Sequence, residues 1–301
     1  MLWIRFLIIT AVCFAAGAAY SAPTVDAALS QDPIADPEYP ATMAELAITV
    51  AGQRLPAHLY IASGAGPHPT VVLLHGFPGN ERNLDLAQAL RRFGFNVLFF
   101  HYRGAWGAEG EYSVLGQLSD IDAVLGYLRE PENAAALRVD ATALSVLGHS
   151  LGGFMALAVG TRVASLQCVL ALAPANLALF GDAMGDGDAT LPDVAAYADA
   201  LFMLRGLTAQ RFASELRLAP IATLDTRLFG PQLAGKAVFL GVGDADTVTP
   251  AAQMFTPLVA AYSKVPGLDL RAALLPGDHS FSGSRIALAR EILSWAGEHC
   301  R

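Results

Sequence analysis

The sequence ALSVLGHSLGG at residues 143–153 decides the fold of this 301-residue chain. Residues 143–147 predict a short strand, and residues 151–163 predict a helix. Between them, the pattern Gly148-x-Ser150-x-Gly152 predicts a tight strand-to-helix turn that presents the serine above a sheet. Glycine is expected on both sides of the serine because a side chain there would collide with neighbouring backbone.

Strand and helix patterns alternate on both sides of this turn. Apolar runs predict buried strands at residues 70–74, 95–100, 166–172, 237–242 and 268–275. Helical spacing is found at residues 83–93, 113–128, 251–262 and 286–296. Two further strands, at 44–50 and 54–61, are expected to pair antiparallel. The alternation predicts an α/β fold with a mostly parallel, twisted sheet, helices on both faces and chemistry at the carboxyl ends of the strands.

Ser150 is a candidate nucleophile, and a serine hydroxyl is a weak nucleophile unless a base removes its proton. Only His279 and His299 follow Ser150, and the histidine is expected last in chain order after this type of turn. His279 lies directly after a predicted strand, whereas His299 follows the last helix, so His279 is the candidate base. The acid that orients the imidazole is expected after strand 237–242. Asp244 and Asp246 compete there, and spacing alone does not separate them.

Acyl transfer also needs hydrogen-bond donors for the negative oxygen that develops on the substrate. The backbone N–H of Leu151, the residue after the serine, is one expected donor. The loop at residues 75–79 is expected to supply the other. Because Pro78 has no N–H, Phe77 is the candidate, and His75 is expected to brace the loop.

Together these motifs resemble the α/β-hydrolase superfamily across nearly the whole chain that follows the N-terminal segment. The resemblance is carried by residues 75–79, His101-Tyr102-Arg103-Gly104, residues 148–153, Gly243-x-x-Asp246 with Pro250, and Gly277-Asp278-His279. In that family the acid commonly stands three residues after the glycine, which selects Asp246. The resemblance implies an α/β-hydrolase fold with Ser150, Asp246 and His279 as its catalytic triad.

The expected function is hydrolysis of carboxylic esters through an acyl-enzyme on Ser150. Residues 101–110 are also similar to the prolyl-oligopeptidase-like and serine-aminopeptidase-like branches, although no large propeller domain is expected before the core. Cleavage of peptide or amide bonds therefore stays open, with Asp193 or Asp199 as a candidate carboxylate for the substrate amine. A non-catalytic binding protein on the same fold is a further alternative. The expected partner is a small-molecule ester or a short peptide.

One irregular segment, at about residues 175–235, interrupts the alternation, with helical patterns near 192–204 and 209–216. It is expected to form a small helical lid, because long insertions in compact domains are often functional. A surface excursion without substrate contact is the alternative. The apolar residues of the segment predict a pocket for an apolar acyl or aryl group: Leu177, Leu179, Phe180, Phe202 and Met203.

Residues 1–21 predict a signal peptide, because Arg5 precedes an apolar run at 6–19 and then small residues. Cleavage is expected after Ser21, which predicts a secreted or periplasmic protein; an uncleaved membrane anchor is the alternative. Residues 22–43 are expected to be an extended lead-in to a catalytic domain over residues 44–301.

Composition restricts the remaining function classes. Hydrophobic residues make up 54% of the chain and charged residues 15%, so a large core is expected. The net charge of −8 and the scattered arginines argue against nucleic-acid binding. No metal-type cysteine or histidine spacing and no dinucleotide motif is present, so no cofactor or metal is expected. After signal cleavage, Cys168 and Cys300 are expected to be unpaired thiols, with a disulfide as the alternative.

Overall fold

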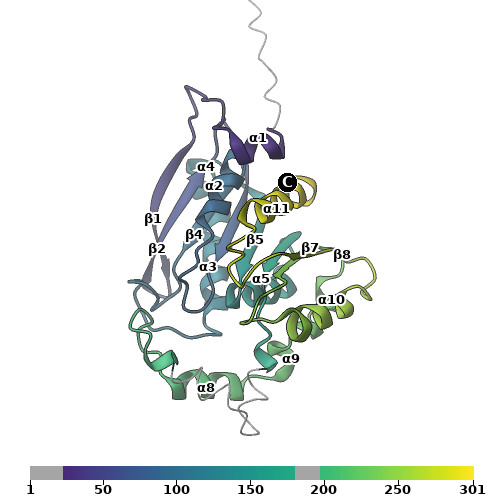
Figure 1. Cartoon of the computed structure of the whole chain (residues 1–301). Coiled ribbons are helices and arrows are strands. Elements are labelled where there is room, and N and C mark those ends of the chain that lie inside the picture. The colour runs from purple at the N-terminus through teal and green to yellow at the C-terminus, as the bar shows by residue number, and fades with distance from the viewer. Residues whose placement is uncertain (1–22, 180–196) are drawn as a thin grey trace, which may run out of the picture.

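A computed structural model of the chain describes residues 23–179 and 197–301 (Figure 1). The eight strands in these residues form one sheet in the order β1-β2-β4-β3-β5-β6-β7-β8. β2 pairs antiparallel with β1 and β4, and the other pairings are parallel. The strands are β1 (Thr42–Val50), β2 (Gln53–Ile61), β3 (His68–Leu74), β4 (Asn96–Phe100), β5 (Val139–His149), β6 (Cys168–Leu172), β7 (Ala237–Gly243) and β8 (Asp269–Leu275).

Helices pack on both faces of the sheet in two groups. α1, α2 and α11 contact one another, and α3 and α5 contact one another (Figure 1). The α-helices are α1 (Val25–Ser30), α2 (Leu84–Arg92), α3 (Gln117–Arg129), α4 (Pro131–Ala136), α5 (Leu151–Arg162), α8 (Ala209–Leu218), α9 (Ile221–Leu224), α10 (Thr256–Tyr262) and α11 (Arg285–His299). Short 3-10 turns occur at η1 (Thr226–Leu228) and η2 (Gly230–Leu233), and a π-helical turn at η3 (Ala251–Phe255). This arrangement confirms the predicted α/β fold.

The central strands form the core because both of their faces are covered. Every residue of β4, β6 and β7 is buried, which is the reason their sequences are continuous apolar runs. β8 lies at the edge of the sheet, and none of its residues is fully buried. Burying a large apolar side chain such as Phe99 contributes roughly 1.5–3 kcal/mol, so the core holds the strand ends firmly in register.

The described part of the insertion docks on the segment that follows β4. The Glu215 carboxylate of α8 accepts hydrogen bonds from the Ser113 hydroxyl at 2.6 Å, the Val114 N–H at 3.0 Å and the Leu115 N–H at 2.6 Å. The helix α3 begins at Gln117 and not at residue 113 as the sequence predicts, and residues 113–115 bond to Glu215 instead. Residues 180–196 of the predicted lid lie outside the described residues, as does the predicted signal peptide.

Two other segments differ from expectation. The lead-in at 22–43 contains a helix, α1, because the Thr24 hydroxyl caps its first turn and Ala28 is buried against the core. The single helix predicted over 251–262 is instead the π-helical turn η3 followed by α10. Pro257 has no N–H to donate one turn back, so the regular hydrogen-bond pattern cannot run through it.

The expectation of two unpaired thiols is wrong, because Cys168 and Cys300 form a disulfide with their Cα atoms 5.2 Å apart. Cys168 is the first residue of β6, and Cys300 directly follows α11. The two residues meet because α11 packs across β6, β7 and β8, which brings its carboxyl end to the start of β6. Strand and helix periodicity carries no information about this long-range contact.

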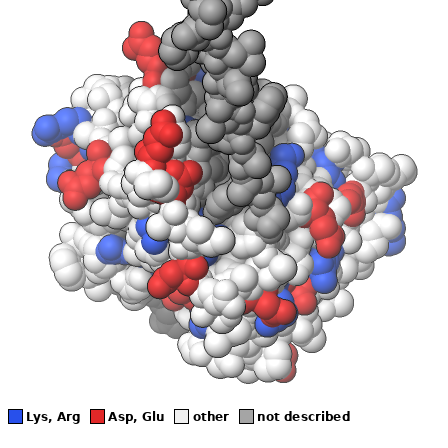
Figure 2. Space-filling model, turned by 90° about the horizontal axis from the view of Figure 1, so that it is seen from above, with Lys and Arg blue, Asp and Glu red and all other residues white. Residues whose placement is uncertain are grey.

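Charged side chains of both signs are interspersed on the face seen from above in Figure 2. Ion pairs at the described surface include Arg54 with Glu109, at 2.5 Å, and Arg290 of α11 with Asp26 of α1. Exposed pairs of this kind contribute at most about 1 kcal/mol each. Absence of nucleic-acid binding, expected from the composition, stays a prediction.

The turn between β5 and α5 has the predicted strand-turn-helix form. Ser150 has φ 60° and ψ −120°, a backbone conformation that residues other than glycine rarely adopt. A Cβ added at Gly148 would lie 1.8 Å from the Gly152 carbonyl oxygen, and one added at Gly152 would lie 2.0 Å from the Leu74 oxygen. Backbone therefore occupies the space of both side chains, which is why glycine stands at both positions.

Gly148→Ala is expected to lower the free energy of unfolding by about 3 kcal/mol, because the new methyl group meets backbone that cannot move aside. Gly126→Ala is the matched control, since Gly126 lies within α3 and an added Cβ meets nothing within 4 Å. That change is expected to raise stability by about 0.5–1 kcal/mol. Urea unfolding followed by circular dichroism measures both, and equal effects would contradict the close approach.

Candidate active site

The sequence-predicted site residues all lie along the edge of the sheet that the carboxyl ends of its parallel strands form. Phe77 follows β3, Ser150 follows β5, Asp246 follows β7 and His279 follows β8. These strands are parallel, so their carboxyl ends meet at this edge, as predicted. The chain thus brings together residues separated by up to about 200 positions.

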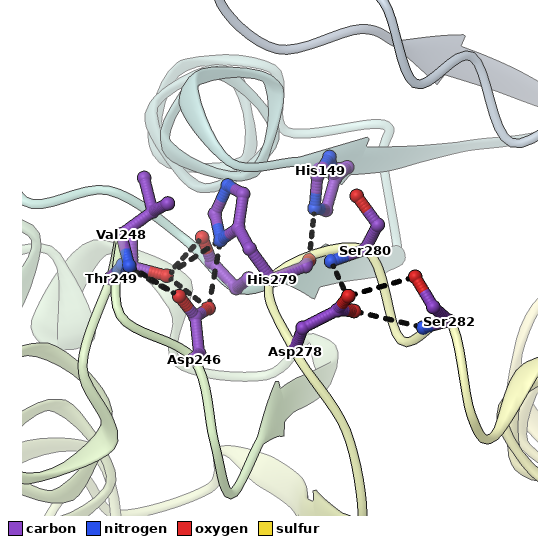
Figure 3. A network of polar contacts seen from close by, with 9 residues as sticks. His149, Asp246, Val248, Thr249, Asp278, His279, Ser280 and Ser282 are labelled. Carbon is purple, nitrogen blue, oxygen red and sulfur yellow. Dashed lines mark hydrogen bonds and ion pairs between the residues drawn. The ribbon is translucent and has the colours of Figure 1, made fainter.

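His279 and Asp246 are hydrogen-bonded. The His279 Nδ1 atom lies 2.8 Å from Asp246 Oδ2, and the Asp246 side chain is fully buried (Figure 3). A carboxylate only accepts, so Nδ1 carries the hydrogen and Nε2 of the neutral ring has the free lone pair. The competing Asp244 is exposed and accepts a hydrogen bond from the Gly277 N–H at 2.9 Å. Asp244 therefore shapes the loop, and Asp246 is the partner of the histidine.

The Asp246 carboxylate has three further donors. Its Oδ1 accepts from the N–H groups of Val248 and Thr249, both at 2.8 Å, and its Oδ2 accepts from the Thr249 hydroxyl at 2.7 Å (Figure 3). Burial by itself raises the pKa of Asp246, but the hydrogen bonds from His279 and Thr249 outweigh it and lower the pKa to about 2. Sequence reasoning missed Thr249, although Asp-x-x-Thr is a spacing at which the two side chains commonly meet in a turn.

The loop that carries His279 is held from two sides. The His149 Nε2 atom donates to the His279 carbonyl at 2.7 Å, and burial lowers the pKa of His149 to about 4, so its ring is neutral at neutral pH. The Asp278 carboxylate accepts hydrogen bonds from the N–H groups of Ser280 and Ser282 (Figure 3). His149 stands next to the serine in sequence, and sequence reasoning assigned it no role.

Ser150 lies at the meeting point of two cavities. The first, called the apolar cavity here, has a volume of about 180 Å³. Its lining residues are Phe77, Ser150, Leu151, Ala175, Leu177, Tyr197, Phe212, Val248 and Thr249. The second, called the polar cavity, has a volume of about 380 Å³. Its lining residues are Gly76, Phe77, Pro78, Gly79, Asn80, Glu81, His149, Ser150, Tyr197, Val248, His279 and Ser280.

Ser150 and His279 line the same cavity, and no direct hydrogen bond joins their side chains in the described residues. Nucleophile and base are often further apart before substrate binds than in the complex. Ser150 lies next to the loop at 75–79, since a Cβ added at Gly76 would lie 3.0 Å from Ser150 Cβ. Leu151 opens α5, where first-turn N–H groups have no carbonyl one turn earlier.

Three aromatic side chains of the apolar-cavity lining lie close to one another. The Phe77 ring centroid lies 5.6 Å from that of Phe212 and 6.2 Å from that of Tyr197. Phe212 comes from α8, so the insertion contributes directly to the site. Tyr197 and Phe212 of the insertion thus line the cavity, and neither was singled out from sequence; the role of the insertion as a lid stays a prediction.

The apolar lid residues predicted from sequence are only partly placed at the site. Leu177 lines the apolar cavity, whereas Leu179 and Met203 do not, and Phe202 is 91% exposed. Phe180 lies outside the described residues. Helical patterns show which residues are apolar, but they do not show which way a short, irregular segment turns its side chains.

Of the two carboxylates that the sequence suggests for the peptidase alternative, Asp199 lines neither cavity. Asp199 is exposed and accepts a hydrogen bond from the Ala209 N–H at 2.7 Å, and Asp193 lies outside the described residues. Glu81, which was not considered from sequence, lines the polar cavity. Residues 23–179 and 197–301 hold no group of three or more histidine, cysteine, aspartate or glutamate side chains arranged to bind a metal ion.

Relatives with known names align with part of this chain. The lysophosphatidylserine lipase ABHD12 of Danio rerio is 30% identical over 99 residues, which are 32% of this chain and 24% of the lipase. Esterase EstD of Thermotoga maritima is 30% identical over 151 residues, covering 46% of this chain and 35% of the esterase. The alignments thus span about a quarter to a third of these relatives' own lengths.

Solved structures share the fold over most of the chain. Est1E from Butyrivibrio proteoclasticus, with bound ferulic acid, has a TM-score of 0.62 and 17% identity, covering 84% of this chain and 98% of its own. The esterase Pf2001 of Pyrococcus furiosus has a TM-score of 0.64 and 15% identity, covering 87% and 92%. The sequence profile described as the alpha/beta hydrolase family matches residues 71–296. The chain therefore belongs to the alpha/beta hydrolase family.

Proposed function

We propose that this chain is a serine hydrolase that cleaves carboxylic esters through an acyl-enzyme on Ser150. The observation that carries the proposal is the hydrogen bond between His279 and the buried Asp246, at a cavity that Ser150 and Phe77 also line. Base, orienting carboxylate, nucleophile and a candidate oxyanion donor are the groups that acyl transfer by a serine requires.

In the first half of the reaction, the Ser150 hydroxyl attacks the ester carbonyl while His279 Nε2 takes its proton. Asp246 holds the imidazole through Nδ1 and stabilises the imidazolium that forms. The backbone N–H groups of Phe77 and Leu151 donate to the negative oxygen of the tetrahedral intermediate. Return of the proton from His279 to the alcohol oxygen then releases the alcohol and leaves the acyl group on Ser150.

In the second half, a water molecule takes the place of the alcohol. His279 removes a proton from the water as it attacks the acyl carbonyl, and the same two N–H groups bind the oxyanion. Collapse of this intermediate breaks the bond to Ser150 and returns the proton to its hydroxyl. The carboxylic acid leaves, and the free enzyme is restored without any cofactor.

The two cavities give each half of the ester a different environment. The apolar cavity is small and has aromatic side chains at Phe77 and Phe212, which supports a short acyl or an aryl group there. The polar cavity has His279, Asn80 and Glu81 in its lining, which supports a polar leaving group. Two of the relatives described above are named as a lipase and an esterase, and both names denote ester cleavage, which also supports the proposal.

Amide or peptide hydrolysis is a second candidate, favoured by Glu81. An aminopeptidase needs a carboxylate to bind the substrate ammonium group, and Glu81 lines the cavity that also holds Ser150 and His279. The same triad serves both reactions, so substrate tests decide between them. A non-catalytic binding protein would leave Ser150 unreactive toward a fluorophosphonate, which labels activated serines.

Export to the periplasm or the medium remains part of the proposal. The predicted signal peptide supports it, and so does the disulfide between Cys168 and Cys300, because disulfides persist mainly in oxidising compartments. None of the helices in the described residues has the length and apolar character needed to span a membrane.

Ser150→Ala is expected to lower ester turnover by about 10⁴-fold or more, because the nucleophile is lost while the fold remains. The substrates are p-nitrophenyl esters of increasing acyl length and aminoacyl arylamides, assayed side by side with the wild type. Ser263→Ala, an exposed hydroxyl after α10, is the control. Ester turnover that survives Ser150→Ala would rule out the proposed mechanism, and arylamide turnover by the wild type would favour the second candidate.

Asp246→Asn is expected to lower kcat by about 10³–10⁴-fold, because an amide in this position no longer holds the imidazole in the required tautomer. Asp244→Asn is the matched control two residues away. It changes only the hydrogen bond with the Gly277 N–H, so kcat is expected to stay within about tenfold of the wild type. Equal losses in the two variants would contradict the assignment of Asp246.

Stability is expected to depend on Asp246 at low pH. The pKa of Asp246 is about 2 in the folded protein against an ordinary value of 3.8, so its contribution is complete above about pH 4 and is lost as pH falls toward 2. Asp246→Asn should flatten the loss of unfolding free energy in that window, and Thr249→Val should flatten it partly. Urea titrations at several pH values measure this, and identical slopes in all three proteins would refute it.

A further inference from the structure

Trp106 lies between the insertion and the oxyanion loop, which is defined here as residues 75–79. Its indole Nε1–H donates to the Pro78 carbonyl at 2.7 Å. Its backbone N–H donates to the Met203 carbonyl of the insertion at 2.9 Å. Two segments that are far apart in sequence are therefore joined through one residue.

The backbone at Trp106 has a conformation that its residue type disfavours. Its φ is +50°, and a bulky side chain at positive φ is uncommon and costs of the order of 1 kcal/mol. Two side chains contact the ring: the Arg82 guanidinium carbon lies 4.9 Å from its centroid, and the His101 ring stacks on it with the centroids 6.2 Å apart. Backbone and ring contacts thus set the direction of the indole N–H.

The oxyanion loop is hydrogen-bonded near both of its ends, by His75 at one end and by the Trp106 indole at the other. His75 Nδ1 donates to the Gly76 carbonyl at 2.9 Å, which orients the peptide that carries the Phe77 N–H. The Trp106 indole holds the Pro78 carbonyl on the other side of Phe77. A loop held at both ends keeps the intervening N–H aimed at a fixed point, which is what stabilisation of an oxyanion requires.

The insertion is itself docked beside Trp106. The Arg205 N–H donates to the Gly104 carbonyl at 2.7 Å, and the Tyr112 N–H donates to the Arg205 carbonyl at 2.9 Å. Phe212 of the same insertion packs on the Phe77 ring. The insertion therefore reaches the oxyanion loop by two routes, through Trp106 to Pro78 and through Phe212 to Phe77.

We propose that Trp106 is a positioning residue that holds the oxyanion loop for the reaction at Ser150 and ties that loop to the insertion. The inference rests on the proposed function, because it assigns the loop the task of presenting the Phe77 N–H to the substrate oxyanion. The proposed effect of the indole N–H is on the stability of the transition state, so substrate binding is expected to be nearly independent of it.

Trp106→Phe tests this, because it keeps an aromatic ring and removes the donor. We expect kcat for the best ester to fall about tenfold or more, KM to stay within about twofold, and the Ki of phenylboronic acid to rise by the same factor as kcat falls. Phenylboronic acid is the probe because its adduct with a serine is tetrahedral and anionic. A merely structural role would change the melting temperature without this parallel change.

Trp295→Phe is the matched control. The Trp295 Nε1 atom is buried and has no hydrogen-bond partner among residues 23–179 and 197–301, so wild-type kcat and Ki are expected. Wild-type values in Trp106→Phe would overturn the inference and leave the proposed function intact, whereas full turnover by Ser150→Ala would overturn the proposed function itself.

A measurement on the wild-type protein covers the case in which Trp106→Phe does not fold. In a ¹⁵N-labelled sample, the indole N–H signal of Trp106 is expected to shift when phenylboronic acid binds, and that of Trp295 is expected to stay in place. A Trp106 signal that does not move on saturation with the boronic acid would overturn the inference.

Discussion

The contact between Gly152 and the end of β3 is the constraint on which the site depends. With no side chain at Gly152, the first turn of α5 lies directly against the Leu74 carbonyl, and a methyl group there would lie 2.0 Å from that oxygen. The contact brings Ser150 and the Leu151 N–H beside the loop that follows β3. Gly76, on the other side, leaves the same kind of space for Ser150. The proposed nucleophile and oxyanion donors are therefore juxtaposed by backbone packing, before any side chain of the site contributes.

The histidine and its carboxylate reach the same edge by a different route, through the loops after β7 and β8. A buried carboxylate is costly unless hydrogen bonds satisfy it. Asp246 receives them from His279, from the Thr249 hydroxyl and from two backbone N–H groups. Only one of these donors is the proposed base, His279, so the local turn stabilises the charge independently of the histidine. This distinguishes Asp246 from Asp244, whose exposed side chain needs no such turn.

The sheet and the turn at Ser150 could be predicted because local patterns indicate them: continuous apolar runs for buried strands, and glycines around Ser150. The choice of Asp246 needed the family resemblance, since spacing alone left two candidates. Other features depend on contacts between distant segments, and no local pattern encodes them. Cys168 meets Cys300 only because α11 crosses the sheet, and Trp106 meets Pro78 only after two loops fold over one another. The packing of Phe212 against Phe77 is another contact of this kind, and the helical spacing of the insertion did not indicate it.

The docking of the insertion has a consequence for how enzymes of this design diversify. Glu215 accepts three hydrogen bonds from residues 113–115, and residues 203–205 bond to the segment around Trp106. An insertion transplanted from a relative would lose these partners unless residues 103–115 travelled with it. In evolution or in chimera engineering, the insertion and residues 103–115 are therefore expected to be exchanged together. Recombination within the pair is expected to alter rate and substrate choice together.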